Sequence, residues 1–154
     1  MKYSLTVPQS SLDALSASVL FKFLAVKPVV ELAMAERFRK MVLANFGIAG
    51  ADRPTDWPPL SWSYALKVGR SIATLEVSGA LKGAVKAGHD GDAGFCSVSN
   101  ADVPYAMGHQ FGSNRLPARP YFPVDADGEV MPYTQSQVQE AAERALFRAL
   151  GGGL

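Results

Sequence analysis

YAMGHQFG (Tyr105–Gly112) and LPARPYF (Leu116–Phe122) are the stretches that organise this sequence. Together they crowd aromatic rings, glycines, prolines and one arginine into a region that is poor helix and poor strand. Fixing such a backbone costs conformational entropy, so the region must be held by packing against something else. Because it also lacks the usual residues of an active site, we interpret it as loop or short turns that form an assembly surface.

The composition describes an ordinary globular chain of 154 residues, 48% of them hydrophobic. This length suits a single domain over residues 1–154, with enough apolar side chains for a core. The formal net charge of +1 gives no basic surplus for nucleic acid or for a membrane surface. The single cysteine, Cys96, has no partner for a disulfide within the chain, which fits a reducing, cytosolic setting.

Residues 1–27 are expected to form an N-terminal arm or helix. Within them, Lys2–Val7 alternates weakly and predicts a short strand, and Leu12–Leu24 predicts an unusually apolar helix. Charged residues interrupt the stretch 12–32, so no run of about 20 apolar residues is available for a membrane span.

A second, long helix is predicted to begin at Pro28, because proline suits the first turn of a helix. Glu36 and Lys40 lie one turn apart on its polar face, and Gly47 is expected to end it. The apolar residues of this helix recur at steps of three and four: Val30, Ala33, Met34, Phe38, Met41 and Val42.

The middle of the chain predicts short elements. Ser61–Val68 reads as a short helix ended by Gly69, and Ala80–Ala87 contains a predicted strand. His89–Asp92 is typical of a hairpin connection, and Phe95–Ser99 is the returning strand, with Cys96 and Val98 on one face.

A C-terminal amphipathic helix is predicted, capped by Thr134 or Ser136 and followed by a flexible tail at 151–154. Its apolar stripe comprises Val138, Ala141, Ala142, Ala145, Leu146, Ala149 and Leu150. The predicted fold class is therefore α+β: a small antiparallel sheet packed against an N-terminal long helix and this C-terminal helix, with long proline- and glycine-rich loops.

The residue types that act as catalysts or metal ligands in other proteins match no catalytic pattern in this sequence. A metal site would have to be built from His89, Asp90, Asp92, Cys96 and His109, whose spacing fits no zinc motif. The loops starting at Asp90 and Asp125 also lack the glutamate that calcium needs at the twelfth position. A dyad of Cys96 and His109 has nothing nearby to activate the thiol. We therefore expect no enzyme, no metal and no cofactor, and we interpret His109 as a hydrogen-bonded structural histidine.

Two loops are the candidate contact surfaces. Arg119 lies between two prolines, close to Tyr121 and Phe122. Its guanidinium either stacks on a ring and binds a partner, or bonds the backbone carbonyls of its own loop, and the sequence favours neither. Trp57 lies in a proline-rich loop, where tryptophan usually docks onto the domain or onto a neighbour.

The order of these motifs resembles the phage virion morphogenesis family, the Mu-like and P2-like tail-completion or neck proteins of tailed phages. The resemblance covers roughly residues 35–150 and is most specific in the motif Tyr-Ala-x-x-His-Gln-Phe-Gly coupled to Pro-Ala-Arg-Pro-aromatic. The matching segments are Arg37, Phe38 and Phe46 of the long helix, Trp57–Ser61, Ser78–Leu81, Val103–Ala106, His109–Gly112 and Pro117–Phe122.

This resemblance implies a structural virion protein that forms a ring at the head–tail junction. The implied partners are other copies of the chain, head-completion or connector proteins, and tail-terminator or tail-tube proteins. DNA would pass through the lumen without specific binding, and no membrane is involved. The implied location is the virion neck, with the host cytoplasm during assembly. The candidate contact residues, from the motifs and the two loops, are Trp57, Tyr105, His109, Phe111, Arg119, Tyr121 and Phe122.

Two other function classes stay open. The first is a soluble adaptor module that never enters a particle. The second is a small metal-dependent hydrolase built on His89, His109 and nearby carboxylates.

Overall fold

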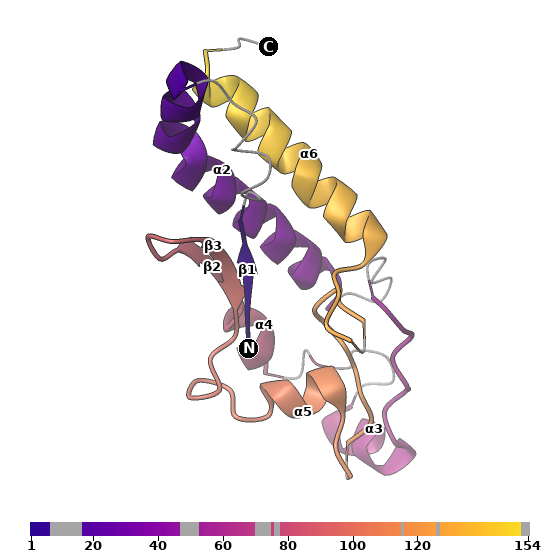
Figure 1. Ribbon diagram of the computed structural model, residues 1–154. Helices are drawn as coiled ribbons and strands as arrows, with labels where there is room; N and C mark the ends of the chain where they lie inside the picture. The colour runs from indigo at the N-terminus through magenta and orange to yellow at the C-terminus, as the bar shows by residue number, and fades with distance from the viewer. Residues whose placement is uncertain are drawn as a thin grey trace.

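The computed structural model describes residues 1–6, 17–46, 53–69, 75, 78–114, 116–125 and 127–151. The chain is α+β, as predicted (Figure 1). The described residues do not include Gly47, residues 7–16 of the predicted arm, or residues 152–154 of the predicted tail. In chain order the elements are β1 (Lys2–Leu5), α2 (Ala17–Ala44), α3 (Trp62–Val68), α4 (Ala80–Gly83), β2 (Lys86–His89), β3 (Gly94–Ser97), α5 (Ala106–Phe111) and α6 (Pro132–Ala149).

The sheet has three antiparallel strands in the order β1-β3-β2, so the returning strand of the hairpin lies in the centre. Cys96 pairs with Tyr3 on one side and with Ala87 on the other. The predicted hairpin is confirmed, and so is the alternation of β3, because Cys96 and Val98 are buried. The predicted strand within residues 80–87 is only partly correct, since its first half is helix α4.

The short helix α4 forms because the turn before it supplies its first bonds. Gly79 adopts a left-handed conformation, with φ of 70°, which suits a residue without a Cβ. Its carbonyl accepts from the backbone N–H of Gly83 at 2.9 Å, and Ser78 Oγ accepts from the N–H of Ala80 at 3.3 Å. The backbone becomes extended only at Lys86, where β2 begins.

The long helix α2 forms the middle layer of the molecule. One side packs on β2 and β3, and another packs on α6 (Figure 1). The C-terminal helix therefore joins the fold mainly through α2, with Val138 reaching the core. The main core cluster is Phe38, Val42, Phe46, Leu81, Ala84, Val85, Cys96, Val98, Val103, Ala106, Tyr121, Phe122, Val124 and Val138.

Pro28 lies inside α2, so the prediction of two separate helices joined there is wrong over the described part. Proline has no N–H to donate to the carbonyl four residues earlier, that of Leu24. Both residues are exposed, which leaves this carbonyl open to water and allows one continuous helix. The apolar periodicity of the second half is confirmed, since Val30, Phe38 and Met41 are buried.

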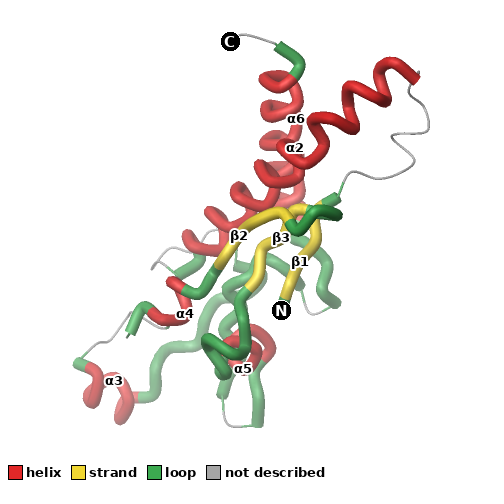
Figure 2. The backbone as a smooth tube through the Cα atoms, turned by 90° about the vertical axis from the view of Figure 1, so that its left-hand side faces the viewer, coloured by secondary structure: helices red, strands yellow, loops and turns green. Residues whose placement is uncertain are grey.

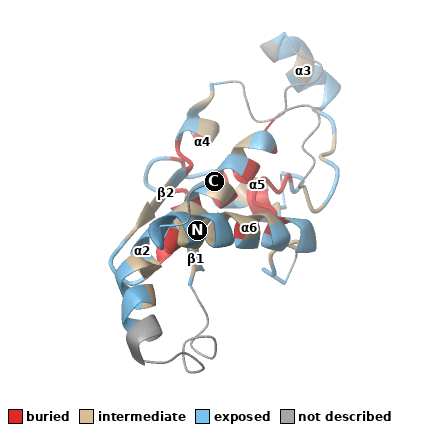
Figure 3. Cartoon of the chain, turned by 90° about the horizontal axis from the view of Figure 1, so that it is seen from above, coloured by how far each residue is buried: buried red, intermediate tan, exposed pale blue. Residues whose placement is uncertain are grey.

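Helix α6 begins differently from the prediction. Pro132 occupies its first turn and Met131 stands at the N-cap without a side-chain bond, so neither Thr134 nor Ser136 caps it. A proline there fits because its missing N–H would lack a helical partner anyway. The predicted stripe is buried at Val138 and half-buried as far as Leu146, and it ends exposed at Leu150 (Figure 3).

Gly94 is required where β3 begins, because the strand there touches the backbone of α2. A Cβ at this position would lie 2.7 Å from the carbonyl carbon of Glu31, and closer still to its oxygen. Real Cβ atoms do not approach backbone so closely, and the backbone of a helix cannot move aside as the end of a flexible side chain can. The distance between sheet and helix is therefore set by a glycine.

We predict that Gly94→Ala lowers the free energy of unfolding by about 2 kcal/mol or more, because overpacking against backbone cannot relax. The matched control is Gly83→Ala in α4, where an added Cβ meets nothing within 4 Å. That variant should stay within about 1 kcal/mol of the parent chain, since alanine favours a helix over glycine. Urea denaturation measures both, and equal stability of the two variants would contradict the contact.

Candidate functional site

The segment Tyr105–Gly112 forms the short helix α5 and corrects the prediction of loop or turns. Tyr105 stands at its N-cap, and Gly112, with φ of 77°, ends it in a conformation that favours glycine. The helix is stabilised by tertiary contacts through Ala106 and Gln110, which are both buried.

Gln110 ties α5 to the segment that follows it. Its Oε1 accepts from the backbone N–H groups of Tyr121 and Phe122, each at 3.0 Å, and its Nε2 donates to the carbonyl of Phe122 at 3.3 Å. In addition, the backbone N–H of Arg119 donates to the carbonyl of His109 at 2.6 Å. The two motifs of the sequence thus form one unit. Gln110 was not among the contact residues predicted from the sequence, although a glutamine inside an aromatic motif was a usable signal.

Tyr121 and Phe122, both predicted contact residues, are core residues instead. Each is 0% exposed, so a partner cannot touch their rings in the folded chain. The Tyr121 ring lies 5.4 Å from that of Phe46, and its hydroxyl donates to the carbonyl of Ala106 at 3.3 Å. Burial raises the pKa of the Tyr121 phenol far above its ordinary value. Their rings are therefore buried in the core rather than available to a partner. The backbone can enter the core with them because Gln110 supplies its hydrogen bonds.

Trp57 and Arg119 bind two loops to each other. The indole Nε1 of Trp57 donates to the carbonyl of Pro120 at 2.8 Å. In return, Arg119 donates from Nε and Nη2 to the carbonyl of Pro58 at 3.2 and 3.1 Å, and from Nη2 to that of Pro59 at 3.2 Å. Arg119 therefore bonds backbone carbonyls, which was one of the two roles predicted for it. These carbonyls belong to the loop that contains Trp57 and not to the loop of Arg119 itself.

The second role predicted for Arg119, stacking on an aromatic ring, is taken by Arg53 on the ring of Trp57. The Arg53 guanidinium lies 3.8 Å from the centre of the Trp57 ring and donates to the carbonyl of Asn45 at 2.6 and 2.8 Å. The Asn45 side chain in turn donates to the carbonyl of Tyr121 at 3.1 Å. Neither Arg53 nor Asn45 was predicted from the sequence, because their role appears only when the end of α2 meets these loops.

A cavity of about 750 Å³ brings Tyr105, His109 and Arg119 together. It lies among α3, α4, α5 and residues 116–119, and Leu81 also lines it. The Tyr105 ring meets the His109 ring edge-on at 5.6 Å. Phe111, the remaining predicted contact residue of α5, is 50% exposed and does not line the cavity.

His109 carries a buried nitrogen, Nδ1, that has no hydrogen-bond partner among the described residues. Burial, and after it the charge of Arg119, lowers the pKa of His109 below its ordinary value of 6.5. The ring is therefore neutral at pH 7, and Arg119 is the charged group of the pair.

We predict that the depressed pKa of His109 makes folding weaker in acid. Above pH 6.5 the ring is neutral in both the folded and the unfolded state, so its full contribution to stability is present. Below pH 6.5 the unfolded chain binds a proton on this ring more readily than the folded chain does. Stability should fall as the pH drops from 6.5 toward the folded pKa. In urea titrations across this range, His109→Gln should lose less stability than the parent chain, whereas identical slopes would contradict the shift.

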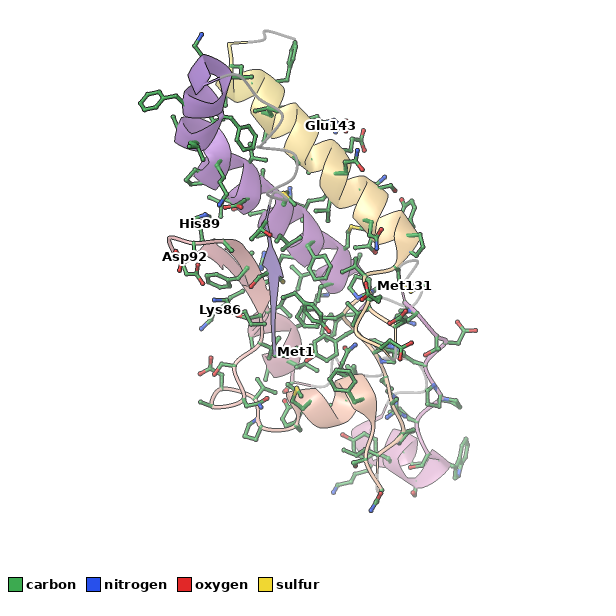
Figure 4. All side chains as sticks on the ribbon, viewed as in Figure 1. Met1, Lys86, His89, Asp92, Met131 and Glu143 are labelled. Atoms are coloured by element: carbon green, nitrogen blue, oxygen red, sulfur yellow. The ribbon has the colours of Figure 1, made fainter. Side chains whose placement is uncertain are left out.

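The residues considered for a metal site have separate structural roles. His89 and Asp92 lie at the turn end of the β2–β3 hairpin (Figure 4). His89 Nε2 lies 3.0 Å from Oε2 of the buried Glu31, which also pairs with Lys27 at 3.0 Å. Asp90 closes the hairpin turn by accepting from the N–H of Ala93 at 3.1 Å. In the part of the chain that the structure describes, no group of three or more His, Cys, Asp or Glu residues is placed to hold a metal. Nor does any helix of that part have the length and apolar character to span a bilayer.

Cys96 is predicted to be inert toward thiol reagents in the folded chain. It is 0% exposed, and burial raises its pKa from 9.0 to about 12, which reduces the thiolate about a thousandfold. Ellman's reagent should react slowly in native buffer and rapidly in denaturant. A native rate equal to the denatured rate would place the thiol at the surface.

Comparisons of the chain with family models, with curated proteins and with solved structures give no match. The phage resemblance therefore rests on the motif residues alone.

Proposed function

We propose that this chain is a structural virion protein of a tailed phage, which forms a ring at the head–tail junction and helps to join tail to head around the DNA channel. Besides the motif resemblance, one structural observation carries the proposal. Large apolar side chains are exposed at the two opposite ends of the molecule.

The first of these, the α3–α5 surface, lies at the lower end of the molecule in Figure 1. Trp62 is 79% exposed there, which leaves most of an indole in water. Its members are Trp62, Tyr64, Leu66, Tyr105, Met107, Phe111 and Leu116. Tyr64, Tyr105 and Leu116 of this set line one cavity, and apolar area gathered in this way marks an interaction site in soluble proteins.

The second, the helix-end surface, lies at the upper end, where α2 begins and α6 ends (Figure 1). Figure 2 shows the first turns of α2 extending away from α6. Phe21, on this projecting part, is 77% exposed. The members of this surface are Phe21 and Leu24 near the start of α2 and Phe147 and Leu150 at the end of α6.

Two unlike surfaces on one chain are what a head-to-tail contact requires. When one surface of each copy binds the other surface of the next, the copies form a ring if the rotation closes. Two of the residues considered for catalysis have structural roles, since His89 pairs with Glu31 and Cys96 lies in the core. This distribution favours assembly over reaction.

The first test is the composition and form of the particles. Mass spectrometry of purified virions should detect the chain, and phages lacking its gene should yield separated heads and tails by electron microscopy. Absence of the chain from virions would leave the adaptor alternative standing, and normal infectious particles without the gene would defeat the proposal.

Surface variants test which side chains make the contacts. We predict that Phe21→Asp and Trp62→Asp fold normally but reduce incorporation into particles about tenfold or more, because each puts a charge into an apolar contact. Tyr133→Asp is the matched control, since this ring is 59% exposed but belongs to neither surface. Quantitative immunoblotting of purified particles, with circular dichroism of each variant, gives the comparison. Equal incorporation of all three would exclude both surfaces.

A further inference from the structure

Arg119 lines the cavity as a cation that pairs with no carboxylate of the described residues. Nε and Nη2 of Arg119 bond the carbonyls of Pro58 and Pro59, whereas Nη1 has no hydrogen-bond partner among the described residues. None of the ion pairs in the described part of the chain includes Arg119. The residue is only 6% exposed, and burial lowers its pKa, so an anion brought beside it would be bound favourably.

The rest of the cavity wall is mainly apolar. Leu75, Leu81, Leu116 and Pro117 line it, and the neutral His109 adds polarity without charge. A volume of about 750 Å³ accommodates one or two large side chains. The wall therefore suits an apolar group that carries a single acidic group.

The most exposed residues that line the cavity also belong to the α3–α5 surface. Tyr64 and Tyr105, each 44% exposed, and Leu116, 38% exposed, line the cavity and are also members of the α3–α5 surface. An occupant that fills the cavity would at the same time cover these exposed side chains. This arrangement fits a segment of a protein better than a free small acid, which would leave the rim in water.

We propose that this cavity binds a peptide segment of a partner protein in which an aspartate or glutamate stands next to a large apolar side chain. The carboxylate accepts from Nη1 of Arg119, and the apolar side chain packs against Leu81 and Leu116. This inference rests on the proposed assembly function, because it names the partner chemistry of the α3–α5 surface.

The first experiment uses the purified full chain and a synthetic positional-scanning library of fluorescent hexapeptides. Fluorescence polarisation should rank highest the peptides that combine Asp or Glu with a neighbouring Phe, Leu or Trp. A ranking without preference for an acidic residue would overturn the proposal. 3-Phenylpropionate serves as the free-acid arm, and binding as tight as that of the best peptide would overturn the assignment to a protein segment.

The second experiment places a competing charge in the site. Ser61 lines the cavity and stands at the N-cap of α3 without a side-chain bond, a position that accepts aspartate and asparagine equally well. Ser61→Asp should pair with Arg119 and weaken the best peptide about tenfold or more, while the matched variant Ser61→Asn should stay within about twofold. Equal affinities of the two variants would contradict a role for charge in binding.

These measurements separate the two proposals. Peptide binding is measured on the isolated chain, so its failure leaves the virion result unaffected. If the chain binds acidic peptides but is absent from virions, the ring function fails and the cavity assignment stands.

Discussion

The side-chain amide of Gln110 is the interaction on which the lower half of the structure depends. Residues 121 and 122 enter the core without a neighbouring strand, so their backbone groups need partners from elsewhere. Gln110, itself 2% exposed, bonds both of their N–H groups and the carbonyl of Phe122 from α5, and Asn45 bonds the carbonyl of Tyr121. Leaving a buried N–H unpaired costs about 1–3 kcal/mol, which means that one amide allows two aromatic rings to pack. Arg119 is linked to the same helix by a separate bond, from its backbone N–H to the carbonyl of His109.

The parts of the fold that the sequence predicted correctly are those with a repeating pattern. The apolar steps from Val30 to Val42, the hairpin at 89–92 and the C-terminal helix each follow from local periodicity or turn chemistry. The errors occur where a long-range contact outweighs local preference. Helix α5 forms because Ala106 and Gln110 are buried, and α2 continues through Pro28 because the carbonyl that loses its partner is exposed.

The candidate site was only partly predictable, for a related reason. Tyr105, His109 and Arg119 were named from the motif, and the fold brings them to one cavity. Their neighbours come from segments far away in the chain, such as Leu81 of α4, and no spacing rule connects them. Aromatic rings beside prolines can also lie either on a contact surface or in the core, and the sequence alone does not distinguish the two. The backbone bonds made by Gln110 decide this for Tyr121 and Phe122, and a sequence pattern does not contain them.

The two tryptophans of this chain occupy opposite environments, and this has a practical consequence. Trp57 is held by a carbonyl, a guanidinium and the Phe46 ring, whereas Trp62 lies almost free in water. Their emission should therefore differ in wavelength and in access to collisional quenchers. The chain thus carries two intrinsic optical reporters, one that responds to loss of tertiary structure and one that responds when the outer face of α3 is covered.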